Sequence, residues 1–222
     1  MINSWGSGWG DGGYFWMSYD TFGQFTKYGY QAYLNTDVSP VRLDTDVVLF
    51  TGASRTQPAF RLMPTDTSLT TYTLNKPLRT GTKLTFRVDT KKQTYLYLLT
   101  ATESDSVAIL QVPALPRHLP IAPNNRTVYP TNQTLELKGK PGLEYMLFLF
   151  SDRQLDDMAS LVQTLNQQKG PFPQRVKEAF GNRLVPNRQV QYKPKKMGFF
   201  LPRTSQVVDR LIPLLITINH VR

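Results

Sequence analysis

Short runs in which apolar and polar residues alternate fill the middle of the chain, and this pattern is typical of β-strands. The predicted strands cover residues 41–50, 83–89, 94–101, 107–112, 134–137 and 144–151. Two of them flank the polar stretch 103–106, which predicts a β-hairpin. The run 145–150 contains only apolar and aromatic residues. It therefore predicts a central strand that is buried on both faces.

After Ser151 the apolar residues recur at helical spacing. One predicted helix carries an apolar stripe made of Leu155, Met158, Leu161, Val162 and Leu165. Ser151 or Asp152 is expected to cap this helix, with Asp156 and Asp157 in its first turn, where negative charge is favourable. A second helix is predicted at 173–184, and Gly181 weakens its end.

The remaining segments complete the predicted fold. Prolines between residues 113 and 130 predict an extended loop, and strands are predicted at 189–192 and 210–221. Pro213 lies in the last of these, which predicts either an edge strand or a strand that starts at this proline. The fold class expected is α+β, a β-sandwich-like body with two helices near its C-terminal end.

The positive charge is concentrated near the end of the chain. Residues 1–168 hold 15 Lys and Arg against 14 Asp and Glu, whereas residues 169–222 hold 11 against 2. A local cluster of cations stands out, and it consists of Lys193, Lys195, Lys196, Arg203 and Arg210. This cluster could bind phosphate or single-stranded nucleic acid, since Tyr192, Phe199 and Phe200 are interleaved with it. A solvated loop or a face toward an acidic partner is the favoured interpretation, and nucleic acid is not the expected partner.

Residue types limit the possible chemistry. The sequence has no cysteine, which excludes disulfides, thiolate metal sites and a cysteine nucleophile within this chain. His118 and His220 are too few and too far apart to indicate a zinc cluster, and no metal or cofactor is expected. Asp44 and Asp46 form a close acidic pair. No apolar run approaches the roughly 18 residues of a membrane helix, so no membrane span is expected.

Residues 3–15 read Asn-Ser-Trp-Gly-Ser-Gly-Trp-Gly-Asp-Gly-Gly-Tyr-Phe. This segment resembles the end of papain-family cysteine peptidases, where an Asn-Ser-Trp-Gly run leads into Trp-Gly and Gly-Tyr. Asp11 stands where the family often has Glu, and Trp16 stands where it often has a basic residue. Residues 18–20 and 28–34 also resemble the closing strands of bacterial members.

The resemblance implies roles for two residues of this chain. Asn3 matches the amide that orients the catalytic histidine, and Trp5 matches the ring that shields this hydrogen bond from water. The cysteine and histidine of the family should precede Asn3, and neither is present in this chain. We therefore expect no peptidase activity from the chain alone. The expected partner is the missing papain-like catalytic domain, and protein or peptide substrates would be cleaved only by the complete enzyme.

The rest of the chain resembles a bacterial domain of unknown function that follows papain-like or caspase-like peptidase domains or protein kinases. The hairpin at 95–112, the segment 123–125 and the run from 142 to 151 carry this resemblance. The expected organisation is a papain-fold C-terminal remnant at 1–34 followed by a β-rich accessory domain at 41–222. The implied function is non-catalytic binding or positioning in a bacterial papain-like peptidase. The alternative is a stand-alone interaction, carbohydrate-binding or cell-surface-binding domain.

Overall fold

The chain forms two compact units, Met1–Val38 and Ser39–Arg222, which we call the front unit and the body. The computed structural model describes residues 8–12, 14–25, 41–52, 55–63, 69–103, 107–112, 120–130, 135–202 and 210–222. Asn3, Trp5 and the segment 28–34 lie outside these ranges.

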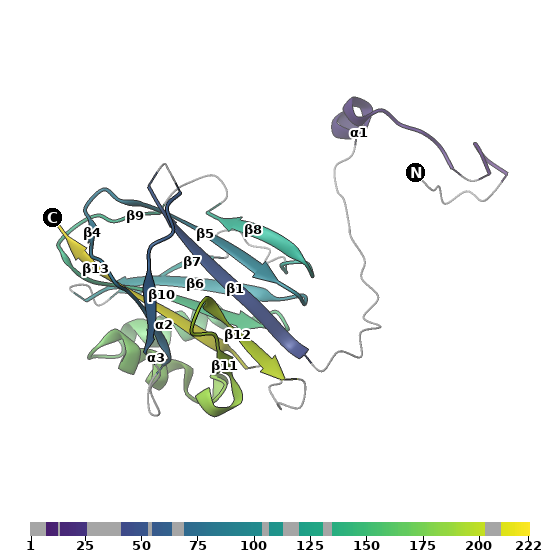
Figure 1. Ribbon diagram of the computed structural model, residues 1–222. Helices are drawn as coiled ribbons and strands as arrows, with labels where there is room; N and C mark the ends of the chain where they lie inside the picture. Colours follow the sequence, from purple (N-terminus) through teal and green to yellow (C-terminus); the bar gives the residue numbers. More distant parts are fainter. Residues whose placement is uncertain are drawn as a thin grey trace. The chain divides into compact units, whose positions relative to one another are not determined.

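The front unit contains a tight turn and one short helix (Figure 1). In the turn, the amides of Asp11 and Tyr14 donate to each other's carbonyl groups at 2.9 and 3.0 Å. Gly10 has a φ of 66°, and a Cβ atom there would lie only 2.4 Å from the Tyr14 carbonyl oxygen, so the turn requires glycine. Helix α1 (Tyr19–Phe25) follows. The expectation of strand at 18–20 is therefore wrong, because the Ser18 hydroxyl accepts the Thr21 amide at 3.1 Å and starts a helix.

Two β-sheets make up most of the body. In the described residues, one sheet has six strands in the order β11-β12-β1-β5-β8, and β9 also pairs with β5. Its strands are β1 (Val41–Thr51), β5 (Lys83–Thr90), β8 (Asn125–Tyr129), β9 (Leu135–Glu136), β11 (Gln191–Tyr192) and β12 (Met197–Pro202). All neighbours in this sheet are antiparallel.

The other sheet has seven strands in the described residues, in the order β2-β3-β13-β10-β6-β7, and β4 also pairs with β13. Its strands are β2 (Phe60–Met63), β3 (Thr71–Leu74), β4 (Leu78–Arg79), β6 (Tyr95–Thr102), β7 (Ile109–Val112), β10 (Gly142–Ser151) and β13 (Ile212–Val221). The predicted hairpin of β6 and β7 is confirmed. The predicted central strand is also confirmed, because β10 pairs with β13 on one side and β6 on the other.

The core lies between the two sheets, so the body is β-rich and sandwich-like (Figure 1). Residues of β10 alternate between two apolar layers, as the strand period requires. Met146, Phe148 and Phe150 belong to the core between the sheets, whereas Leu147 and Leu149 belong to a second core under the helices. The second core exists because helices cover the outer face of the seven-stranded sheet.

Helices α2 (Met158–Gln167) and α3 (Phe172–Phe180) form this cover. The predicted start of the first helix is wrong by several residues. Ser151 ends β10, and the Leu155 amide donates to the Tyr97 hydroxyl at 2.7 Å, which holds the connection outside the helix. Asp157 is the N-cap residue but binds Arg183 through two bonds of 2.9 and 3.1 Å instead of capping. No helix in the described part of the chain is long and apolar enough to cross a membrane.

Near the end of the body, the second helix is shorter than predicted, and one of the two alternatives for Pro213 is confirmed. Helix α3 stops at Phe180 because Gly181 has a φ of 42°, and a short 3-10 turn follows over Gly181–Arg183. Pro213 is the second residue of β13, an interior strand, and the parallel pairing with β3 begins only at Leu215. The edge-strand alternative is therefore wrong, and the strand-start alternative is confirmed.

Candidate functional site

The most developed polar site lies on the outer face of the six-stranded sheet, where β1 presents two carboxylates. Leu43 and Val47 of β1 point into the core, so Asp44 and Asp46 project from the opposite face. Asp46 lies directly opposite Asp89 of β5, which places a third carboxylate on the neighbouring strand. This row of like charges requires cations to balance it.

The hairpin formed by β11 and β12 supplies the central cation. The Lys193 ammonium lies 2.6 Å from Oδ1 of Asp44 and 2.5 Å from Oδ1 of Asp46, so it bridges both carboxylates. Lys91 pairs with the second oxygen of Asp44 at 2.9 Å, and Lys196 lies 3.5 Å from that of Asp46. The ammonium of Lys193 thus offsets the repulsion between the two carboxylates. The described residues contain no cluster of His, Cys, Asp or Glu side chains that could hold a metal ion.

The hydrogen bonds of this network, and not its burial, keep Asp44 and Lys193 charged. Burial alone would raise the pKa of Asp44, but hydrogen bonds from Lys193 and Lys91 outweigh it and lower that pKa below its ordinary value of 3.8. Burial alone would lower the pKa of Lys193, and its bonds to Asp44 and Asp46 instead raise it above 10.5. Both groups therefore stay charged at neutral pH. Neither is suited to general acid–base catalysis or to nucleophilic attack by a free amine.

A buried tyrosine from the opposite sheet anchors the β11–β12 hairpin, which carries Lys193 and which we call the lysine hairpin. The Tyr72 hydroxyl lies 2.7 Å from the carbonyl oxygen of Gly198 and 3.0 Å from that of Lys193, and it accepts the Gly198 amide at 3.1 Å. Burial raises the pKa of Tyr72 to about 12, so the hydroxyl keeps its proton for donation. The position of the Lys193 backbone is thus tied to the core of the sandwich.

The lack of a side chain at Gly198 leaves room for the Asp46 carboxylate. It pairs with Asp46 across β1 and β12, and a Cβ atom at Gly198 would lie 2.4 Å from the Thr45 carbonyl oxygen and 2.6 Å from Oδ1 of Asp46. Contacts this short do not occur at a side-chain carbon. The ion network therefore depends on a glycine at this position.

An open hollow of about 540 Å³ lies over this network. Its lining combines four lysines, two carboxylates and two rings, namely Lys91, Lys193, Lys195, Lys196, Asp44, Asp46, Tyr192 and Phe200, together with Gln191 and Pro194. The lysines outnumber the carboxylates, and Lys195 forms no ion pair within the described part of the chain. The hollow is therefore positive at its rim.

The structure brings together two groups of residues that are far apart in the sequence, the acidic pair and part of the basic cluster. The acidic pair Asp44 and Asp46 meets Lys193 and Lys196 of the basic cluster. Arg210 lies elsewhere, in a hollow beside the end of α3, and Arg203 is outside the described residues. His118 is outside them too, as are the papain-like candidates Asn3 and Trp5.

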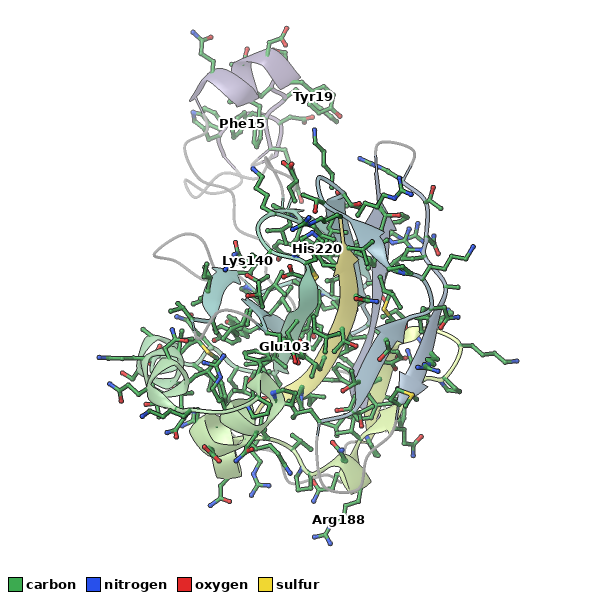
Figure 2. The ribbon with its side chains drawn as sticks, turned by 90° about the vertical axis from the view of Figure 1, so that its left-hand side faces the viewer. Phe15, Tyr19, Glu103, Lys140, Arg188 and His220 are labelled. Atoms are coloured by element: carbon green, nitrogen blue, oxygen red, sulfur yellow. The ribbon has the colours of Figure 1, made fainter. Side chains whose placement is uncertain are left out.

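A second polar cluster closes one end of the sandwich core. His220, near the end of β13 (Figure 2), has its Nδ1 atom 2.9 Å from Oε1 of Glu144 and its Nε2 atom 2.9 Å from the Thr80 hydroxyl. This order of hydroxyl, imidazole and carboxylate is the connectivity of a catalytic triad. However, the amides of Thr80 and Gly81 donate to the carbonyl oxygens of Val221 and Leu137, so they are not free to stabilise an oxyanion. The cluster is better suited to joining the ends of β10 and β13.

The buried Glu144 makes the stability of the body pH-dependent. Burial raises the pKa of Glu144 above its ordinary value of 4.5, and His220 opposes this increase without cancelling it. The raised pKa means that the stabilising contribution is complete below pH 4.5 and is lost as the pH rises through the folded-state pKa. We therefore compare the unfolding free energy of the wild type with that of Glu144→Gln. The difference, wild type minus variant, is predicted to decrease as the pH is raised from 4.5 to neutral.

Urea unfolding across this pH range measures the difference. The variant Glu178→Gln removes an exposed carboxylate and gives the background. A wild-type advantage over Glu144→Gln that increases with pH would contradict the assignment.

No family model, curated protein or solved structure matches the chain.

Proposed function

We propose that the body is a non-catalytic binding module and that it serves a bacterial papain-like cysteine peptidase by binding or positioning a protein. The observation that carries the binding role is the lysine-rimmed hollow over β1 and the β11–β12 hairpin. The peptidase context comes from the resemblance of residues 3–15 to the end of that family.

The geometry of the hollow favours binding over catalysis. Its floor is held by the bonds of Lys193 to Asp44 and Asp46 and by the Tyr72 hydroxyl beneath the hairpin. A floor that is already ordered reduces the conformational entropy that is lost on binding. The lowered pKa of Asp44 and the raised pKa of Lys193 keep these two groups ionised at neutral pH, so neither is suited to proton transfer.

The papain-like resemblance supplies the place of the module in a larger enzyme. Asn3 and Trp5 would orient and shield a catalytic histidine that is contributed by the preceding domain. The module would then act behind a catalytic domain, in contact with substrate or with the domain itself.

We predict that the purified chain hydrolyses neither casein nor fluorogenic peptides, because it has no thiol nucleophile. The assay is run beside active papain as the positive control. Peptidase activity that co-purifies with the folded chain and is insensitive to thiol-directed inhibitors would contradict the proposal, whereas inhibition by such reagents would indicate a contaminating peptidase, since the chain has no thiol. Reading the gene upstream of the Met1 codon tests the context: papain-like sequence with a cysteine and a histidine supports it, and an unrelated gene favours an independent domain.

Sugar binding is a second candidate function, and the most exposed rings among the described residues favour the front unit for it. Trp16 and Tyr19 are 92% and 96% exposed, and exposed flat rings are suited to stacking on sugars. Within the described ranges of the body, the exposed large apolar side chains are aliphatic, namely Met63, Val107, Ile109, Val128 and Leu143. A glycan array that is probed with the wild type and with Trp16→Ala separates sugar binding from a positioning role.

A further inference from the structure

Two hollows flank the turn of the lysine hairpin. Beside the hollow of about 540 Å³ lies a second one of about 220 Å³, and both are lined by Asp46, Lys195 and Lys196. These two lysines therefore form a ridge between the hollows. A ligand that crosses the ridge would contact both hollows.

The second hollow differs in chemistry from the first. The apolar side chains available to its lining are those of the half-buried Val48, Pro58 and Phe60, whereas Val47, Leu49 and Met197 also border it but have their side chains in the core. At its border, Arg87 donates to Asp89 at 3.1 Å, so these two charges neutralise each other. The volume of this hollow suits one large apolar side chain.

We infer that the ridge binds an extended acidic segment of a partner protein, with carboxylates over Lys195 and Lys196 and a large apolar side chain in the second hollow. This inference rests on the proposed binding function. Charge complementarity supports it, since the protein carries a net charge of +10 and Lys195 has no carboxylate partner among the described residues. Neighbouring apolar and basic surfaces match a peptide that has both kinds of side chain.

The carboxylates of the site argue against nucleic acid. A phosphate backbone carries a charge at every step, and it would approach Asp44 and Asp46 in the floor as well as Asp89 nearby. Lys193 is already bound to two of these carboxylates and is not free for phosphate. A peptide avoids this repulsion because its carboxylates can be spaced apart and separated by an apolar residue.

Fluorescence polarisation with the full chain tests the inference. The probe is a fluorescein-labelled peptide in which glutamates flank a central phenylalanine. The double variant Lys195→Ala, Lys196→Ala should weaken its binding about tenfold, because two exposed charge pairs are lost. Replacing the phenylalanine of the probe by serine should weaken binding to the wild type by a similar factor, about tenfold.

The matched control is Lys138→Ala, Lys140→Ala, on the loop between β9 and β10 (Figure 2). This loop lies toward the other end of β1, since β9 pairs with Leu84, which faces Thr51. The control variant should bind the probe as tightly as the wild type does. Circular dichroism verifies that each variant is folded.

Three outcomes would overturn the inference: no binding of the probe, equal loss in both double variants, or tighter binding of single-stranded DNA that depends on Lys195 and Lys196. None of these affects the proposed function directly. That function fails separately, if the chain alone is an active peptidase or if an unrelated gene precedes it.

Discussion

Replacing Phe148 with alanine should lower the free energy of unfolding by about 4 kcal/mol, the largest effect that we expect from a single core substitution. Phe148 is fully buried at the centre of β10, and its ring meets Phe86 of the opposite sheet edge-on at 5.0 Å. It also stacks beside Phe150 at 6.4 Å. The alanine variant loses this contact between the sheets and leaves a cavity. Urea unfolding followed by circular dichroism measures the change.

A control on the same strand separates packing from strand propensity. Leu143→Ala also removes a large side chain from β10, but Leu143 is 36% exposed and lies at the edge of the layer. It should cost less than about 1 kcal/mol. Similar losses for the two variants would mean that the body is not held together by the core that joins its sheets.

Local pattern was enough to predict the elements that form this core. The apolar run at 145–150 can be satisfied only by burial on both faces, and β10 is buried on both because α2 and α3 cover the second face. The hairpin of β6 and β7 was predictable because its polar turn separates two apolar strands. The sandwich-like arrangement follows from such strands once enough of them are present.

Short or irregular strands were not predictable in the same way. β3 alternates well, with Tyr72 and Leu74 buried, but four residues are too few to distinguish a strand from a loop. β8 lies in the segment that proline content assigned to a loop, because Asn125–Tyr129 avoids the prolines on either side of it. The pair Phe199 and Phe200 was ambiguous until β12 placed one ring in the core and the other at the hollow.

The candidate site illustrates what sheet order adds to sequence. Asp44 and Lys193 are 149 residues apart, and they meet because β12 pairs with β1 while β11 pairs with β12. In the sequence, Lys193 stands out in a basic cluster and Asp44 in an acidic pair, but nothing there identifies the two as partners. Tyr72 and Gly198 carried no signal of a role, since their importance comes from contacts between the sheets and across strands.

This dependence on sheet pairing leads to the second large effect, at Gly198. We predict that Gly198→Ala lowers the unfolding free energy by about 3 kcal/mol, because the new Cβ atom overlaps the Thr45 carbonyl oxygen and Oδ1 of Asp46. β1 and β12 would have to separate, which also disturbs the bonds that Lys193 donates to Asp46 and that the Tyr72 hydroxyl donates to the Gly198 carbonyl. Urea unfolding gives the stability, and binding of the acidic probe peptide reports the state of the ridge.

A double-mutant cycle with Asp46→Ala measures how much of the lost stability comes from the contact with the Asp46 carboxylate and how much from the contact with the Thr45 backbone. Removing the Asp46 side chain from the Gly198→Ala protein relieves the contact at 2.6 Å, whereas the contact of 2.4 Å with the Thr45 backbone remains. The double variant should therefore recover only part of the lost stability. Full recovery would mean that the carboxylate alone sets the limit, and no loss in Gly198→Ala itself would show that β1 and β12 do not pair in this register. Only the second outcome would show that the ion network does not depend on this glycine.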